Sequence, residues 1–176
     1  MNEWTIEDAE DLYRVQRWSD GYFGIGANGK LLALPNVGKQ EVPIALQDVI
    51  DELRDQNVQF PVVMRFHDIL KNRVKQLNEA FATAIANFEY EAPYRGVFPI
   101  KVNQMREVVD EIVEAGRPFH YGLEAGSKSE LMAVLSYDTG EEALTICNGY
   151  KDDDFLRLAL LGRKLGRKVV VVIEKY

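Results

Sequence analysis

The chain has 176 residues, 47% of them hydrophobic, so it is long and apolar enough to bury a core, which excludes general disorder. Its 28 acidic and 21 basic residues give a net charge of -7, without a basic cluster, so nucleic acid is not an expected partner. The single cysteine excludes an internal disulfide, and the sequence does not begin with an export signal, so we expect a cytoplasmic protein. No apolar run approaches the ~20 residues of a membrane helix, so no membrane partner is expected.

The first third of the sequence predicts two helices with a hairpin between them. Thr5 is expected to begin a helix that ends near Trp18, because carboxylates in its first turns suit the helix dipole. Asn28-Gly29 then separates two apolar runs, a pattern typical of a tight β-hairpin. Apolar residues at helical spacing within 43–56 predict the second, shorter helix.

From residue 61 onward, short apolar runs alternate with helical patterns. The first run, at 61–66, precedes a long helix expected from Asp68 to about Tyr90, with one apolar stripe. Further strands are expected at 96–100, 119–123, 143–147 and 168–173, and helices near 104–115, 128–136 and 152–165. The strand midpoints lie about 25 residues apart, a spacing that fits parallel strands joined by crossover helices.

Helix signals agree with this pattern. Ser127 and Glu130 form a capping-box sequence, and Gly116 and Gly166 stand where helices should end. Nearly continuous apolar strands predict an α/β fold with a parallel sheet covered by helices, either an open doubly wound sheet or an eight-stranded barrel. The sequence stops soon after the last strand and would leave an unpaired sheet edge, so we expect the chain to be a fragment.

Three polar residues are expected at the carboxyl edge of the sheet, where sites of parallel strand-helix folds lie. Lys101, Glu124 and Asn148 each follow one of the predicted strands, and they bring an amine, a carboxylate and an amide together. An amine in a partly dry pocket can condense with an aldehyde. From position alone, a solvated lysine is favoured for Lys101 and a turn residue in Asn148-Gly149 for Asn148, and Glu124 has the alternative of a carboxylate at a helix N-terminus.

Other signals predict no site. Glycines at 24, 26 and 29 match the dinucleotide motif G-x-G-x-x-G, but a strand follows them where the motif needs a helix, so we interpret them as part of the hairpin. His67 and His120 are too far apart to suggest a pair. Cys147 ends an apolar strand, where a thiol is usually a small buried hydrophobe.

The sequence also resembles the biosynthetic arginine decarboxylases, along nearly its whole length. The similarity is in PYRGVFPIKVNQMREVVDEIVEAG, GLEAGSKSELMAVL, ICNGYKDDDFLRLALLGRKLG, WTIEDAEDLYRVQRWSDGYFGI and RFHDILKNRVKQLNEAFATAI. Proteins of this kind belong to the wider group of alanine-racemase-like decarboxylases, which use pyridoxal 5'-phosphate.

The resemblance implies a fold and a site. Residues 67–176 would form the first half of a TIM-type (β/α)8 barrel, and residues 1–66, an α+β segment, would belong to a β-rich second domain. Lys101 would hold pyridoxal 5'-phosphate as a Schiff base, and Glu124 and Asn148 would lie against the cofactor. The resemblance also implies Mg²⁺, although the sequence shows no cluster of ligands for it.

The implied activity is decarboxylation of L-arginine to agmatine and carbon dioxide, in polyamine and spermidine biosynthesis, by a homo-oligomer, a dimer or a tetramer. The acid that pairs with the cofactor ring nitrogen, the glycine-rich phosphate-binding segment and the interface residues fall outside this sequence, so the chain alone is expected to be inactive. The alternatives are an ornithine or diaminopimelate decarboxylase, and a barrel protein that binds the cofactor without catalysis, or a fragment with a regulatory or assembly role.

Overall fold

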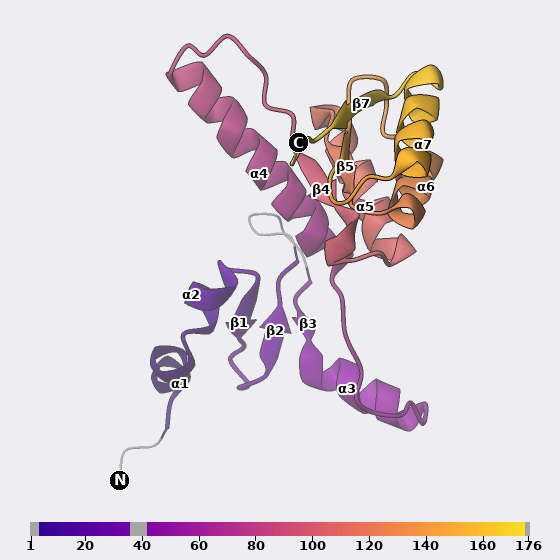
Figure 1. Cartoon of the computed structure of the whole chain (residues 1–176). Coiled ribbons are helices and arrows are strands. Elements are labelled where there is room, and N and C mark those ends of the chain that lie inside the picture. Colours follow the sequence, from indigo (N-terminus) through magenta and orange to yellow (C-terminus); the bar gives the residue numbers. More distant parts are fainter. Residues whose placement is uncertain (1–3, 36–41, 175–176) are drawn as a thin grey trace. The chain divides into compact units, whose positions relative to one another are not determined.

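A computed structural model describes residues 4–35 and 42–174 of the chain (Figure 1). The chain divides into two compact units, Met1–Ile69 and Leu70–Tyr176. Parts of both predicted domains lie outside the described residues, namely 1–3 and 36–41 of the first and 175–176 of the second. The assignment of 1–66 to a β-rich domain and of 67–176 to half of a barrel stays a prediction.

The first unit contains a small antiparallel sheet of order β1-β2-β3. The elements, in chain order, are α1 (Ile6–Tyr13), α2 (Val15–Ser19), β1 (Phe23–Ile25), β2 (Leu31–Ala33), β3 (Ile44–Ala45) and α3 (Leu46–Asp55). The expected hairpin is confirmed: β1 and β2 pair across a turn in which Gly29 has a φ of 78°, a value that glycine adopts without strain. The two-residue strand β3 was not predicted, because the apolar spacing of this segment is helical.

The N-terminal helix begins as predicted but is broken in two. Thr5 caps α1, and its capping box closes on Asp8. Arg14 then takes a left-handed conformation, φ 50°, and separates α1 from α2, so the prediction of one continuous helix to Trp18 was wrong. The physical reason lies in burial: none of the residues of α1 is buried, whereas the turn at Arg14 allows Val15 to be 5% exposed.

The second unit holds a parallel four-stranded sheet of order β4-β5-β6-β7, as the α/β pattern predicted (Figure 1). The elements in chain order are α4 (His67–Asn87), β4 (Val97–Pro99), η1 (Ile100–Val102), α5 (Arg106–Gly116), η2 (Arg117–Phe119), β5 (Gly122–Ala125), α6 (Lys128–Ser136), β6 (Leu144–Cys147), α7 (Asp153–Lys164) and β7 (Lys168–Val171). In Figure 1, α6 and α7 lie side by side, and they pack on β5 and β7 respectively.

Two strand predictions differ from the structure. The run at 61–66 is not part of a strand in the described residues. The strand expected at 119–123 begins only at Gly122, because Pro118 lies in the short 3-10 helix η2 and His120 then takes a left-handed conformation, φ 54°. The chain therefore enters the sheet three residues later than the apolar pattern predicts.

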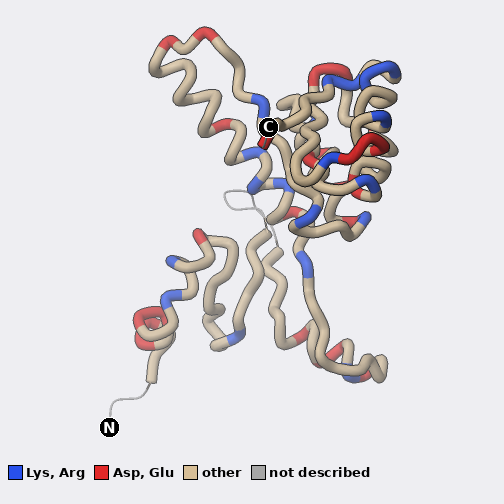
Figure 2. The backbone as a smooth tube through the Cα atoms, in the orientation of Figure 1, with Lys and Arg blue, Asp and Glu red and all other residues tan. Residues whose placement is uncertain are grey.

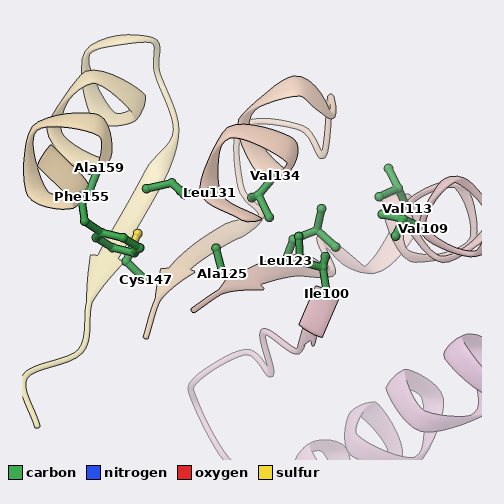
Figure 3. Close-up of a cluster of buried hydrophobic side chains, with 10 residues drawn as sticks. All are labelled: Ile100, Val109, Val113, Leu123, Ala125, Leu131, Val134, Cys147, Phe155 and Ala159. Carbon is green, nitrogen blue, oxygen red and sulfur yellow. The ribbon is translucent and has the colours of Figure 1, made fainter. Parts of the chain in front are cut away.

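The core of the second unit lies between the sheet and its helices (Figure 3). Figure 3 shows Phe155 of α7 over Cys147 of β6, and Leu131 of α6 beside them, all almost completely buried. β5 and β6 approach so closely that a Cβ at Gly122 would lie 2.0 Å from the carbonyl oxygen of Leu144. This contact leaves room only for glycine at that position.

Acidic and basic residues are both distributed along the chain, as Figure 2 shows. In α7 the acidic residues Asp153 and Asp154 lie in the first turn, and the basic residues Arg163 and Lys164 lie in the last turn, the arrangement that complements the helix dipole. Among the described residues, every helix is too short or too polar to cross a membrane.

Candidate cofactor-binding site

The carboxyl edge of the parallel sheet brings the three predicted site residues together. Lys101 lies in η1, directly after β4, and Asn148 directly follows β6. Glu124 lies inside β5, paired in register with Pro99, so the expectation that it follows its strand was wrong. The reason is that β5 continues to Ala125, because Glu124 and Ala125 pair with Ile146 and Cys147 of β6.

Glu124 is the centre of this group. Its Oε1 atom lies 3.9 Å from the Lys101 Nζ atom. The Asn148 Nδ2 group donates to the same oxygen at 3.5 Å, which is long for a hydrogen bond. The side chain of Glu124 is 16% exposed and that of Lys101 is 61% exposed. A largely buried carboxylate therefore lies beside an amine that a ligand can reach from solvent.

Asn148 serves the turn and the site at the same time. Its backbone N–H donates to the Ala125 carbonyl at 2.9 Å, and its Oδ1 atom accepts the Gly149 N–H at 2.9 Å. The amide nitrogen remains directed at Glu124. The turn interpretation and the site interpretation of Asn148 are thus compatible, because they use different atoms of one side chain.

Gly149 packs the turn after β6 against the turn after β5. Its φ is 77°, and a Cβ at this position would lie 2.6 Å from the Gly126 carbonyl oxygen. A side chain would therefore meet both backbone strain and a steric clash. This close approach holds Asn148 near the end of β5.

Glu130 is a residue of this edge whose position the sequence did not reveal. Its N–H donates to Ser127 Oγ, as the capping pattern predicted, but its carboxylate does not close the capping box on Ser127. Instead, Oε2 accepts the Gly126 N–H at 2.6 Å, and Oε1 accepts from Gln104 Nε2 at 3.2 Å. Glu130 thus connects the loop after η1 to the turn after β5.

A second amine lies on the same edge. The Nζ group of Lys151 donates to the Gly149 carbonyl. Burial raises the pKa of the Cys147 thiol, and the positive charge of Lys151 lowers that pKa by a smaller amount. The raised pKa keeps Cys147 protonated and fits its interpretation as a small buried hydrophobe. Lys151 stands three residues after Asn148, and that proximity was the only available signal for it.

An ion pair joins the starts of α6 and α7 nearby. Lys128 Nζ lies 2.7 Å from Asp152 Oδ2, and Asp152 also caps α7 by accepting the Phe155 N–H. The hydrogen bond from Lys128, and then that from Phe155, lower the pKa of Asp152. The same bond to Asp152 raises the pKa of Lys128.

Within residues 4–35 and 42–174, no group of three or more His, Cys, Asp or Glu side chains could hold a metal ion. The magnesium ion that the resemblance implied stays a prediction. The site described above is a set of amine, carboxylate and amide groups, whose chemistry suits an organic ligand with a carbonyl group.

Residues 71–174 match the family model described as pyridoxal-dependent decarboxylase, pyridoxal binding domain. The biosynthetic arginine decarboxylase of Prochlorococcus marinus (strain MIT 9303) is 46% identical over 172 residues, which is 98% of this chain and 26% of that protein. The biosynthetic arginine decarboxylase of Phocaeicola vulgatus is 44% identical over 175 residues, 99% of this chain and 28% of that protein.

A solved structure agrees with these sequence relatives. The crystal structure of the biosynthetic arginine decarboxylase of Campylobacter jejuni has a TM-score of 0.82 at 31% identity, and the match covers 92% of this chain and 26% of that one. The chain therefore spans about a quarter of the length of its relatives. The resemblance seen in the sequence is confirmed, and because the family model matches more than half of its residues, the chain belongs to the pyridoxal-dependent decarboxylases.

Proposed function

We propose that this chain supplies the cofactor-holding lysine, Lys101, of a pyridoxal-phosphate enzyme that decarboxylates L-arginine to agmatine and carbon dioxide. One observation carries the proposal: the reachable amine of Lys101 lies 3.9 Å from the largely buried carboxylate of Glu124, at the carboxyl edge of a parallel sheet. That edge is where parallel strand-helix folds place their sites.

The residues present fit a cofactor that has an aldehyde and a ring. Condensation with an aldehyde needs an unprotonated amine. Glu124 Oε1 lies 3.9 Å from Lys101 Nζ and would take its proton once the two atoms approach to hydrogen-bond distance. Asn148 Nδ2 lies 3.5 Å from the same carboxylate oxygen. When bound, the cofactor supplies the electron sink that accepts the electron pair left by departing carbon dioxide.

Glu130 and Gly149 keep the two loops of the site in register. Glu130 holds Gly126 and Gln104 together, and Gly149 allows the turn that bears Asn148 to approach Gly126. Glu124 lies on a central strand between these loops, so its distance from Lys101 is set by backbone packing on both sides. Such a fixed geometry suits a lysine that must meet one atom of a ligand.

Arginine as the substrate is supported by the names of the relatives, whose products would enter polyamine and spermidine biosynthesis. We also propose that the parallel sheet is part of a (β/α)8 barrel, that residues 1–66 join a β-rich domain, and that the complete enzyme is a cytoplasmic homo-oligomer. The parallel order β4-β5-β6-β7 supports the barrel, because each strand follows its neighbour through a crossover helix.

Reductive labelling tests the role of Lys101. The chain is incubated with pyridoxal 5'-phosphate, reduced with borohydride, digested and analysed by mass spectrometry. The added mass is expected on the peptide that contains Lys101, and Lys101→Gln should remove it. Lys151→Gln, which removes the second amine of the same edge, is the matched control and should leave the labelling at Lys101 intact. Labelling that stays after Lys101→Gln would contradict the assignment.

A carbon-dioxide release assay tests the substrate. The chain alone, with the cofactor, is expected to release none, whereas the complete enzyme should release it from arginine in preference to ornithine, diaminopimelate and lysine. A preference for ornithine or diaminopimelate would move the assignment to a sister decarboxylase. Labelling of Lys101 without release from any of these substrates by the complete enzyme would favour a carrier of the cofactor.

A further inference from the structure

One cavity of the Leu70–Tyr176 unit lies at the amino edge of the sheet, the opposite edge from Lys101. Its volume is about 270 Å³, and Arg95 and His120 line it together with apolar side chains of α4 and of the loops before β4 and β5. Arg95 precedes β4 by two residues and His120 precedes β5 by two residues. Since parallel strands begin at the same edge, the topology alone brings these two side chains together.

The cavity combines the permanent positive charge of Arg95 with a largely apolar lining. Its lining includes Arg95 and His120 but no acidic residue, and apolar groups such as Ala82, Ile85 and Pro118 form much of the remainder. The guanidinium group of Arg95 donates to the Tyr94 carbonyl at 3.2 Å. Within the part of the chain that the structure describes, neither Arg95 nor His120 forms an ion pair.

Glu142, a carboxylate outside the cavity, interacts electrostatically with residues of its lining. The pKa of Glu142 is lowered mainly by Lys168, whose Nζ atom lies 2.6 Å away, and to a smaller extent by Arg95 and His120. Because Glu142 already has Lys168 as its partner, it does not neutralise Arg95. An excess of positive charge therefore remains at this edge of the sheet.

His120 is held in place by an unusual backbone conformation. Its φ is 54°, in the left-handed region that few residues other than glycine, asparagine, aspartate and histidine enter readily. Its N–H donates to the Arg117 carbonyl at 3.2 Å, which ends η2 and sets the direction of the side chain before β5 begins.

We propose that this cavity binds a small organic anion, a molecule with one carboxylate or phosphate group and a short apolar body. Arg95 provides a permanent positive charge and paired N–H donors for the anionic group, and His120 provides a further donor. The volume limits the ligand to a molecule smaller than most drug-sized ligands, whose pockets measure roughly 300–1,000 Å³. The proposal is independent of the cofactor site, since no residue is shared between them.

Titration of the purified chain, followed by calorimetry, tests this proposal with four probes. Benzoate and phenyl phosphate carry the two anionic groups on one apolar ring, inorganic phosphate lacks the apolar part, and benzyl alcohol lacks the charge. Benzoate or phenyl phosphate is expected to bind more tightly than the other two probes, and the tighter of the pair identifies the anionic group. Equal binding of benzyl alcohol would overturn the proposal.

Variants locate the binding. Arg95→Gln and His120→Asn, the latter chosen because asparagine also tolerates a left-handed backbone, are each expected to weaken binding about tenfold. Arg163→Gln removes the same charge from the exposed last turn of α7 and should have no effect. Equal weakening by Arg163→Gln would show a general charge effect and overturn the proposal.

A further variant keeps the test decisive if Arg95→Gln fails to fold, which circular dichroism would reveal. Ala82→Leu adds an apolar side chain from α4 to the cavity while preserving helix propensity. Loss of benzoate and phenyl phosphate binding in this variant, with cofactor labelling of Lys101 unchanged, is the expected result. Unchanged binding would mean that the probes bind elsewhere and would overturn the proposal.

Discussion

Glu124 shows how much of the site depends on one residue. The largely buried carboxylate contacts an amine on one side and an amide on the other, so its charge is the feature most closely linked to the chemistry of Lys101. Replacing the carboxylate by an amide preserves size and preserves the acceptor for Asn148. It removes the group that can take a proton from Lys101.

Glu124→Gln is therefore expected to slow cofactor labelling of Lys101 by about tenfold or more, a modest share of the effect that positioned acids and bases have. The measurement is the time course of borohydride-trapped mass on the Lys101 peptide. Glu107→Gln, an exposed residue in the first turn of α5, provides a control for the loss of one negative charge. An unchanged time course in Glu124→Gln would exclude proton transfer by Glu124.

Gly149 illustrates how a single backbone atom can decide a residue type. Gly149→Ala places a methyl group in a left-handed conformation and 2.6 Å from the Gly126 carbonyl oxygen, whereas Gly166→Ala meets only the left-handed conformation, φ 88°, in open space. The first change should lower the free energy of unfolding by about 1–3 kcal/mol more than the second. Urea unfolding of both variants measures this difference. Equal effects would mean that the two turns can separate without loss.

At the scale of elements, helix boundaries followed from the sequence better than strand boundaries did. Ser127 and Asp152 cap α6 and α7 through bonds to residues three positions later, so the signal is local and readable. The start of β5 depends on η2 and on the left-handed His120, which apolar spacing does not encode. The break between α1 and α2 at Arg14 could not be predicted for the same reason, because it depends on the burial of Val15 and not on local helix signals.

The Lys128–Asp152 ion pair leads to a prediction about pH. The pKa of Asp152 lies below its usual value of 3.8, so its stabilisation is present above that pH and is lost as pH falls toward the folded value. The pKa of Lys128 lies above its usual value of 10.5, so its stabilisation is present below that pH and is lost as pH rises through the folded value. The pair should thus stabilise the fold across the whole neutral range.

Asp152→Asn keeps a capping side chain but removes the charge. The difference in free energy of unfolding between the original chain and this variant should stay constant at neutral pH and shrink below about pH 4 and above about pH 10.5. Asp154→Asn, on the exposed side of the same turn, should show a smaller difference. A difference for Asp152→Asn that does not change with pH would show that the ion pair does not contribute.

At the scale of the whole molecule, the parallel sheet and the meeting of Lys101, Glu124 and Asn148 could be predicted, because both follow from strand order. Strand ends of a parallel sheet share an edge whatever the side chains do. The partners of Glu130 and the position of Lys151 could not be predicted, since they depend on rotamers and on loops that are distant in sequence. The cavity of Arg95 and His120 needs the packing of α4 as well, which no local pattern specifies.

The division into two compact units predicts that the chain does not unfold as one cooperative body. Leu131 is fully buried in the second unit and Val15 is buried in the first. Leu131→Ala should lower the stability of the second unit by about 2–5 kcal/mol, because it leaves a cavity, whereas the neighbouring exposed Met132→Ala should change little. Hydrogen exchange followed by mass spectrometry reports each unit separately.

After Leu131→Ala, faster exchange is expected in peptides of α6, β5 and β6, and exchange in peptides of α1 to β3 should be unchanged. After Val15→Ala, faster exchange is expected in peptides of α1 to β3, and exchange in peptides of α6, β5 and β6 should be unchanged. Global unfolding would instead raise exchange in both sets of peptides by the same factor in either variant, which would contradict the prediction. Independent units would also mean that the site at Lys101 forms wherever the second unit folds, because all of its contacts lie between β4 and the start of α7. Lys101 labelling should therefore persist in Val15→Ala and decline in Leu131→Ala.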